Sequence, residues 1–284
     1  MSENKIYLCA ISNIESGTCN EDCKFCTQSV KYKADIQRYR RKEVEDIVKE
    51  AIIARKNRAI GFCLVTAGTG LDDKRLDYVC RAASAIKKEL GDELSLIACN
   101  GIATLDQLKE LKKHGIENYN HNLETAQEFY NEICTTHPWE DRYQTCLNAK
   151  EAGLQLCTGG IFGLGETQEN RISMLKSIAS LEPMSVPINF FHPNEALPIV
   201  KNSISREEAF ELIKLSREYL PNQMIMIAGG RELMFKEQEY DVFKYGANAL
   251  VVGDYLTTAG KTAQEDIDAI EALGYEIALD CKSR

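Results

Sequence analysis

Short apolar runs rich in β-branched residues alternate with helical segments along this chain, and the alternation limits the folds open to it. Strands are predicted at eight such runs, which span 6–12, 60–66, 94–99, 116–121, 154–161, 185–191, 224–228 and 249–252. Between them, apolar residues recur at the spacing of amphipathic helices, as at 44–55, 76–90, 105–113 and 142–152. A capping-box pattern, Ser205 followed by Glu208, opens a further helix that ends at Tyr219. These repeats predict an α/β fold, a closed (β/α)8 TIM-type barrel or a related open sheet, and we expect the barrel.

The composition is that of a globular protein without nucleic-acid or membrane contacts. No linker rich in Pro, Gly or Ser divides the 284 residues, so a single domain over 1–284 is expected. A net charge of −9 without a basic stripe argues against a nucleic-acid partner. The segment 1–7 lacks the pattern of a signal peptide, and no apolar stretch approaches the roughly 18 residues that span a bilayer. We therefore expect a cytoplasmic protein.

Cysteine usage points to metal chemistry. Eleven cysteines in such a chain predict reduced thiols or metal ligands rather than disulfides. Three of them, Cys19, Cys23 and Cys26, form a C-x3-C-x2-C triad after the first predicted strand. Three thiolates hold three irons of a cubane cluster and leave the fourth iron open, whereas electron-transfer clusters normally take four cysteines. The alternatives are inert thiols or a zinc site, which needs a fourth ligand from far away, such as His121 or Cys99. The triad therefore predicts an iron–sulfur cluster at which chemistry takes place.

Further polar and thiol side chains fall where a barrel carries its active site. Catalytic residues of such barrels lie at the carboxyl ends of strands and in the loops that follow. The residues at or near such positions are Cys63, Cys99, Asn120, His121, Asn122, Cys157, Asn189 and Arg231. A polar group inside a barrel costs free energy unless something pairs with it, so a ligand or metal is expected there. Other cysteines and histidines fall in no motif and are predicted to be core or surface residues: Cys9, Cys80, Cys134, Cys146, Cys281, His114, His137 and His192.

The triad, with Phe25 before its last cysteine, resembles the signature of radical S-adenosylmethionine enzymes. The run from Gly159 to Glu166 is similar to the G-x-I-x-G-x-x-E pattern of that superfamily. The resemblance implies that the triad binds a 4Fe–4S cluster and that S-adenosylmethionine chelates its open iron. One electron then cleaves this cofactor into methionine and a 5′-deoxyadenosyl radical. The resemblance also implies contacts to S-adenosylmethionine from Phe25, Asn122, Glu124 and Ile161.

Five further segments resemble the biotin synthases and occur in that family's order: 119–124, 157–161, 163–167, 186–189 and 256–258. The resemblance runs from about residue 11 to 258. It implies a 2Fe–2S cluster held by Cys63, Cys99, Cys157 and Arg231, with dethiobiotin between it and S-adenosylmethionine. Radicals would abstract hydrogen from a methyl and then a methylene carbon, and a cluster sulfide would supply the thioether sulfur. It further implies a flavodoxin or ferredoxin electron donor and a homodimer.

Each assigned role has a plainer alternative. A single buried cysteine often acts only as a small apolar side chain of the core. The guanidinium of Arg231 stays protonated, so it is a poor metal ligand, and the alternative is an ion pair with a carboxylate. Glu124 is a candidate to bind the ribose hydroxyls of S-adenosylmethionine, and the alternative is that it begins a helix. Thr257 and Thr258 are candidates to bind the substrate carboxylate, and the alternative is that they cap a helix. The side-chain amides of Asn120, Asn122 and Asn189 can bond to the acceptor and donors of a cyclic urea. The alternative is that these asparagines form turns.

Two loops, 64–70 and 190–198, depart from the commoner form of the family, so their substrate contacts are not predicted. Two other functions stay open. One is another radical S-adenosylmethionine enzyme, such as a maturase or mutase, which need not keep the second ligand set. The other is a non-catalytic iron–sulfur or zinc-binding protein.

Overall fold

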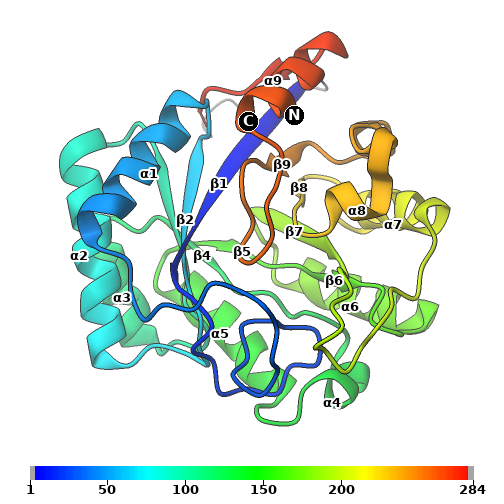
Figure 1. The fold of residues 1–284 in the computed structure, drawn as a ribbon, viewed down its shortest axis with the longest axis horizontal. Helices are drawn as coiled ribbons and strands as arrows, with labels where there is room; N and C mark the ends of the chain where they lie inside the picture. Colours follow the sequence, from blue (N-terminus) through cyan, green and yellow to red (C-terminus); the bar gives the residue numbers. More distant parts are fainter. Residues whose placement is uncertain (1–3, 281–284) are drawn as a thin grey trace.

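The computed structural model describes residues 4–280, and ten strands form one sheet around its centre (Figure 1). The strand order is β10-β1-β2-β3-β4-β5-β7-β8-β9, and the tenth strand, β6, pairs with β7 off this path. All pairings between strands are parallel, and β1 pairs with β9 to close the barrel. The predicted TIM-type barrel is thus confirmed over the open sheet. Cys281 lies outside the described residues. The strands are β1 Lys5–Glu15, β2 Gly61–Thr66, β3 Ser95–Cys99, β4 Asn118–Asn120, β5 Gln155–Cys157, β6 Gly160–Phe162, β7 Ser185–Phe190, β8 Met224–Ile227, β9 Ala249–Val251 and β10 Glu276–Ile277.

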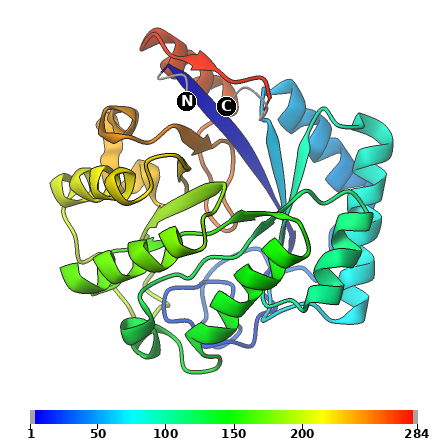
Figure 2. The ribbon, with the colours of Figure 1, turned by 180° about the vertical axis from the view of Figure 1, so that it is seen from behind.

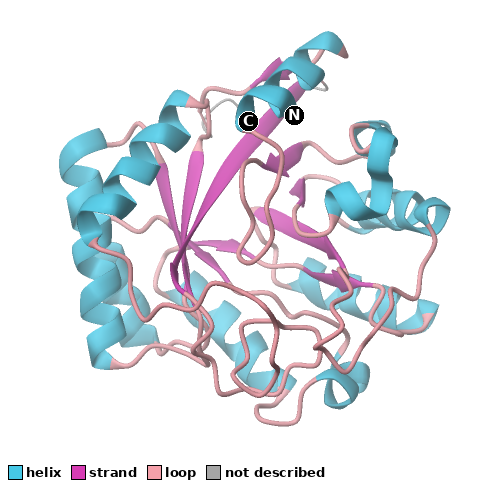
Figure 3. Ribbon diagram, in the orientation of Figure 1, coloured by secondary structure: helices cyan, strands magenta, loops and turns pink. Residues whose placement is uncertain are grey.

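The helices lie on the outside of the strands (Figures 2 and 3). Ser205 accepts a hydrogen bond from the backbone of Glu208 at the start of α7, which confirms the capping box. No helix of residues 4–280 is both long and apolar enough to cross a membrane. The α-helices are α1 Val44–Lys56, α2 Asp73–Leu90, α3 Leu105–Lys113, α4 Tyr130–Ile133, α5 Trp139–Glu151, α6 Gln168–Ser180, α7 Arg206–Tyr219, α8 Arg231–Phe235 and α9 Ala263–Ala272, with short 3-10 turns at Gln127–Phe129, Lys236–Gln238 and Asp241–Tyr245.

The strands separate two sets of core residues. Successive side chains of a strand point to opposite faces, so each strand serves both sets. One set packs under the helices and includes Leu8, Leu64 and Leu96. The other fills the inside of the barrel with side chains from β1, β2, β3, β8 and β9: Tyr7, Cys9, Cys63, Val65, Ile97, Met224, Met226, Ala228, Ala249 and Val251.

The predicted strand 154–161 is two strands, β5 and β6, with a break at Gly159. The backbone of Gly159 leaves the sheet pattern, because its N–H donates to Asn122 Oδ1 at 3.1 Å and its carbonyl accepts from Leu123 N at 3.0 Å. A Cβ at this position would lie 1.8 Å from the carbonyl oxygen of Pro187 in β7, so only glycine fits. The break therefore draws the segment 122–124 against the sheet.

Candidate functional site

The loop after β1 folds back on itself and presents the three triad thiols. Cys19 donates its N–H to the Gln28 carbonyl at 3.3 Å, and its own carbonyl accepts from Val30 N at 2.8 Å. A tight turn joins the other two cysteines, because Cys26 N donates to the Cys23 carbonyl at 3.0 Å. This loop lies among those at the carboxyl ends of the strands, low in Figure 1. The C-x3-C-x2-C spacing thus becomes one compact donor set.

The chemistry of this donor set fits a cluster. Burial raises the pKa of Cys19, and it raises the pKa of Cys26 to about 12; each thiol also lies in the field of other anionic groups. Cys26 is partly exposed by surface area but is closely surrounded by protein atoms, which accounts for its raised pKa. Adjacent thiols with raised pKa values give up their protons when a cation takes up the charge. The residues present therefore fit a 4Fe–4S cluster.

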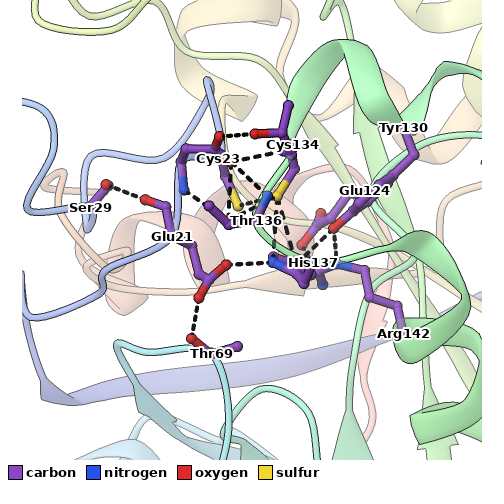
Figure 4. Close-up of polar contacts among 12 residues, drawn as sticks. Glu21, Cys23, Ser29, Thr69, Glu124, Tyr130, Cys134, Thr136, His137 and Arg142 are labelled. Atoms are coloured by element: carbon purple, nitrogen blue, oxygen red, sulfur yellow. Dashed lines mark hydrogen bonds and ion pairs between the residues drawn. The ribbon is translucent and has the colours of Figure 1, made fainter.

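A second segment, 133–137, is bound tightly to the triad loop (Figure 4). Lys24 N donates to the Ile133 carbonyl at 2.9 Å, and the Asp22 carboxylate accepts from Thr135 N at 2.9 Å. Hydrogen bonds from Thr135 and Thr136 outweigh burial and hold the pKa of Asp22 well below its ordinary value. The segment is therefore part of the site's framework.

This segment brings a thiol and an imidazole to Cys23. Cys23 Sγ lies 3.6 Å from Cys134 Sγ, and His137 Nδ1 lies 2.7 Å from Glu21 Oε2 (Figure 4). The hydrogen bond from Cys23 lowers the pKa of Cys134 to about 4, and the same contact together with burial raises the pKa of Cys23. Cys134 and His137 belong to no motif predicted above. Their close spacing along the chain is the one sequence signal for them.

Two predicted thiols of the second set are bonded to each other, and the third acts on them electrostatically. Cys63 lies in β2, Cys99 ends β3 and Cys157 ends β5. The pKa of Cys63 is raised well above its ordinary value, because its thiol bonds to Cys99, because it is buried, and because Cys99, Cys157 and Cys9 are close. Cys9, on the inner face of β1, was not predicted to be a site residue. Several thiols inside an apolar barrel fit the thiolate ligands of a 2Fe–2S cluster.

Arg231, the predicted fourth ligand, is held against carboxylates. Its Nη2 lies 2.8 Å from Asp266 Oδ1, and its Nη1 lies 3.4 Å from Glu239 Oε2. Burial acts to lower the pKa of Arg231, but Tyr255, Asp266 and Glu232 raise it above its ordinary value. Within residues 4–280, its buried Nε and Nη1 donate no hydrogen bond. The structure thus bonds Cys63 to Cys99 and pairs Arg231 with acidic side chains, and the predicted ligand set stays a prediction.

Two buried oxygens, one beside each thiol set, lack a hydrogen-bond partner among the described residues. They are Oδ1 of Asn120, whose residue pairs with Cys157 in the sheet, and Oε2 of Glu124. The other oxygen of Glu124 lies 3.5 Å from Arg142 Nη1, and burial raises the pKa of Glu124. Ile161 N donates to the Glu124 carbonyl at 2.8 Å. Unpaired buried acceptors are costly, so these two oxygens fit a bound molecule with N–H or O–H donors.

The remaining predicted residues are partly engaged with the protein itself. Asn189 donates to the Gly160 carbonyl at 3.2 Å and accepts from Gly229 N at 2.9 Å, so its amide bridges β6 and the end of β8. Phe25 is half-buried and packs against the main core. The structure therefore gives Asn189 and Phe25 structural contacts in addition to any ligand contact.

The loop 253–262 reaches across to the triad loop. Thr257 Oγ1 lies 3.0 Å from Thr27 Oγ1, and Asn13 Nδ2 donates to the Leu256 carbonyl at 2.8 Å. Thr258 is exposed, and its carbonyl accepts from Tyr255 N at 3.0 Å. Neither threonine caps a helix, since Thr262 has that role for α9.

Comparisons with known proteins agree with this geometry. The family model of the Radical SAM superfamily matches residues 14–178, and that of the Biotin and Thiamin Synthesis associated domain matches 187–276. The chain is 82% identical over 281 residues to the biotin synthase of Aliarcobacter butzleri, with 99% of both chains covered. It is 64% identical over 277 residues to the biotin synthase of a Nitratiruptor species, with 98% of this chain and 99% of the relative covered.

Solved structures at lower identity share the fold. Methylornithine synthase superposes with a TM-score of 0.83 at 19% identity, covering 97% of this chain and 84% of that one. The hydrogenase maturase HydG from Carboxydothermus hydrogenoformans has a TM-score of 0.83 at 21% identity, covering 98% of this chain and 68% of that one. The full-length identity to biotin synthases disfavours the alternative of a maturase or mutase. The chain belongs to the biotin synthase family of the radical S-adenosylmethionine superfamily.

Proposed function

We propose that this chain forms biotin by inserting sulfur into dethiobiotin. The observation that carries the proposal is the presence of two separate thiol sets in one barrel, the triad on the β1 loop and the set formed by Cys63, Cys99 and Cys157. When bound, the 4Fe–4S cluster supplies the electron that cleaves S-adenosylmethionine into methionine and a 5′-deoxyadenosyl radical, and the 2Fe–2S cluster supplies the sulfide. One radical is needed for each of the two C–H bonds that become C–S bonds.

The proposal assigns the metal ligands as follows. Cys19, Cys23 and Cys26 hold the first cluster. The barrel thiols hold the second, within walls that include Val65, Met226 and Ala228. Such apolar walls exclude water, and exclusion of water protects reactive species from side reactions. Arg231 is assigned as the fourth ligand of the second cluster, supported by two buried nitrogens, Nε and Nη1, that donate no hydrogen bond among the described residues, and opposed by its carboxylate partners.

The polar residues are assigned to the two small molecules. The unpaired Oδ1 of Asn120 accepts from an N–H of the cyclic urea, and Asn122 and Asn189 complete the amide contacts. Glu124 accepts from the ribose hydroxyls of S-adenosylmethionine, with Phe25 and Ile161 beside the cofactor. Thr257 and Thr258 lie on a loop bound to the triad loop, and we assign them to the substrate carboxylate.

Partners and setting complete the proposal. A cluster that gives one electron for each S-adenosylmethionine cleaved needs a one-electron donor, which we assign to a flavodoxin or ferredoxin. A homodimer and a cytoplasmic setting follow from the same family expectation, and thiolate ligands persist in a reducing compartment.

Anaerobic reconstitution tests this function. The full chain is loaded with iron and sulfide and incubated with S-adenosylmethionine, dethiobiotin and a strong reductant, and biotin and 5′-deoxyadenosine are assayed. We expect both products, and their absence from fully loaded protein overturns the proposal. Cys157→Ala is expected to keep 5′-deoxyadenosine formation and lose biotin. The matched control is Cys146→Ala, a buried thiol that bonds to the His121 carbonyl and is not a proposed ligand. An unchanged biotin yield in Cys157→Ala removes Cys157 from the ligand set.

A further inference from the structure

Cys23, Cys134 and His137 stand at the separations of a mononuclear metal site. Their ligand atoms all lie within 4.8 Å of one another, and all three residues are buried. Cys134 Sγ is 3.6 Å from Cys23 Sγ and 3.4 Å from His137 Nδ1 (Figure 4). In a tetrahedral zinc site, bond lengths of about 2.3 Å to sulfur and about 2.0 Å to nitrogen place two sulfurs about 3.8 Å apart and sulfur and nitrogen about 3.5 Å apart. The two contacts therefore already have the edge lengths of such a tetrahedron.

The backbone fixes this approach on both sides. Lys24 N donates to the Ile133 carbonyl at 2.9 Å, one residue from each cysteine. The Asp22 carboxylate accepts from Thr135 N at 2.9 Å and from Thr136 Oγ1 at 3.1 Å. Because the neighbours of both cysteines are bonded to each other, the closeness of the thiols is built into the fold.

The imidazole has the orientation that a metal ligand needs. Tyr130 Oη lies 2.8 Å from His137 Nε2, and Arg142 Nε donates to the same oxygen at 2.6 Å. Ligating histidines commonly donate their second N–H to such a partner, which leaves Nδ1 to face the ion. In the ion-free protein Nδ1–H donates to Glu21 Oε2 at 2.7 Å. An ion that takes the place of this proton is within reach of both atoms. Carboxylates are established zinc ligands, so Glu21 completes a four-ligand set.

We propose that the cluster-free protein binds one divalent ion of the zinc type at Cys23, Cys134 and His137, with Glu21 as fourth ligand. The ion and the 4Fe–4S cluster exclude each other, because both need Cys23. The exclusion rests on the assignment of Cys23 to the cluster, whereas the ion site stands without it. The ion-bound protein is a resting form that must release its ion before the cluster is built.

Cobalt(II) is the probe for the site. The full chain, cluster-free and anaerobic, carries Cys19→Ser and Cys26→Ser so that the triad does not chelate the ion. We expect a thiolate-to-cobalt charge-transfer band and the strong visible bands of tetrahedral cobalt. Adding Cys134→Ser removes one bound cobalt per chain, and adding Tyr130→Phe weakens binding about 10–100-fold because the imidazole loses its orienting partner. Cys146→Ser, the matched control, leaves binding unchanged. Equal cobalt binding with and without Cys134→Ser overturns the site.

A second measurement needs no variant. In the unaltered cluster-free chain, zinc is expected to slow the alkylation of Cys134 relative to Cys80, as read by mass spectrometry of each peptide. Cys80 is buried on α2, outside either thiol set. The site is overturned if zinc slows the alkylation of Cys134 no more than that of Cys80, or does not slow it at all. This result decides the matter even if the serine variants do not fold.

The exclusion is read from cluster assembly. Zinc-loaded chain is expected to form the 4Fe–4S cluster more slowly than zinc-free chain when iron and sulfide are added, and Cys134→Ser is expected to abolish this delay. A delay that persists in Cys134→Ser refutes the exclusion. If the fully cluster-loaded enzyme forms no biotin, the proposed function fails, but the cobalt-binding result is unaffected. Failure of the proposed function and failure of the ion site are therefore distinguishable.

Discussion

The Glu166 carboxylate and the Arg171 guanidinium form a buried ion pair, with Arg171 Nε 2.9 Å from Glu166 Oε1. The same carboxylate accepts from the backbone N–H groups of Gly163 at 2.9 Å and Leu164 at 2.7 Å. Glu166 thus closes the turn that follows β6 and ties it to α6. The glutamate of the G-x-I-x-G-x-x-E pattern is therefore a shaping residue for the strand that carries Ile161.

Loss of the Glu166 charge is expected to destabilise the fold. Glu166→Gln removes the nearer carboxylate from the buried Arg171 guanidinium and leaves only the exposed Glu208, 3.8 Å away, as its anion among the described residues. Removing one partner of a buried pair costs about 3–5 kcal/mol. Urea unfolding of the cluster-free chain measures the change in the free energy of unfolding. Glu169→Gln, at an exposed position in the first turn of α6, is the control and is expected to change it by less than about 0.5 kcal/mol. Equal unfolding midpoints for the two variants would contradict the assigned role.

Asn120 and Asn189 are expected to respond differently to the same substitution. The Oδ1 of Asn120 has no partner among the described residues, so Asn120→Ala removes a substrate contact and raises KM for dethiobiotin with little loss of stability. The Asn189 amide bonds to two backbone groups, so Asn189→Ala lowers the free energy of unfolding by about 1–3 kcal/mol. Urea unfolding and steady-state assays of both variants separate the roles. A large stability loss in Asn120→Ala would count against its role in binding.

The barrel was predictable because strand and helix periods recur along the whole chain, and the capping box placed Ser205 correctly. The break at Gly159 was not, because the apolar residues at both ends of 154–161 predict one strand across the two glycines. The interruption comes from the approach of Pro187 and from bonds to the segment 122–124, which are contacts between distant parts of the chain.

The same limit applies to the site. The triad is local, so its spacing alone places the three cysteines on one loop after β1, where the backbone bonds of that loop hold them. Cys134 and His137 join it only through tertiary contacts with Glu21 and Cys23, more than a hundred residues earlier. The nearest carboxylate to Arg231, that of Asp266, likewise arrives from α9, which the pattern around Arg231 does not reveal.

Tyr78 is expected to make stability depend on alkaline pH. Its buried hydroxyl donates to the Lys42 carbonyl at 2.7 Å, and burial raises its pKa from 10.0 to about 12. Below pH 10 the tyrosine is neutral in both states, so its full contribution is present. Between pH 10 and 12 the unfolded chain loses the proton first, and about 2–3 kcal/mol is lost as pH rises through this window.

Tyr78→Phe tests this dependence. The variant is expected to lose about 1 kcal/mol at neutral pH with the hydrogen bond, and to show a shallower fall in stability from pH 10 to 12. Urea unfolding at several pH values measures both effects. Tyr143→Phe, whose hydroxyl bonds to Ser180 at an exposed site, is the control. Parallel pH curves for the unaltered chain and Tyr78→Phe would rule out Tyr78 as the source.

Arg231 allows its structural and ligand roles to be separated. Arg231→Met leaves Asp266 buried without a cation, whereas Glu239 keeps its ion pair with Lys261. A loss of about 3–5 kcal/mol in the free energy of unfolding is expected from the unpaired Asp266. Arg231→Lys restores the charge and is expected to recover part of that loss. Since three thiolates remain, the lysine variant is expected to keep its second cluster, which contributes about two irons per chain. If Arg231 is a ligand of that cluster, its replacement alters the visible absorption and the paramagnetic resonance of the cluster. Iron content and both spectra of the reconstituted lysine variant show whether Arg231 is a cluster ligand. Exchange of a ligand must shift the electronic transitions of the cluster. An unaltered spectrum with full iron content therefore means that Arg231 only pairs with the carboxylates.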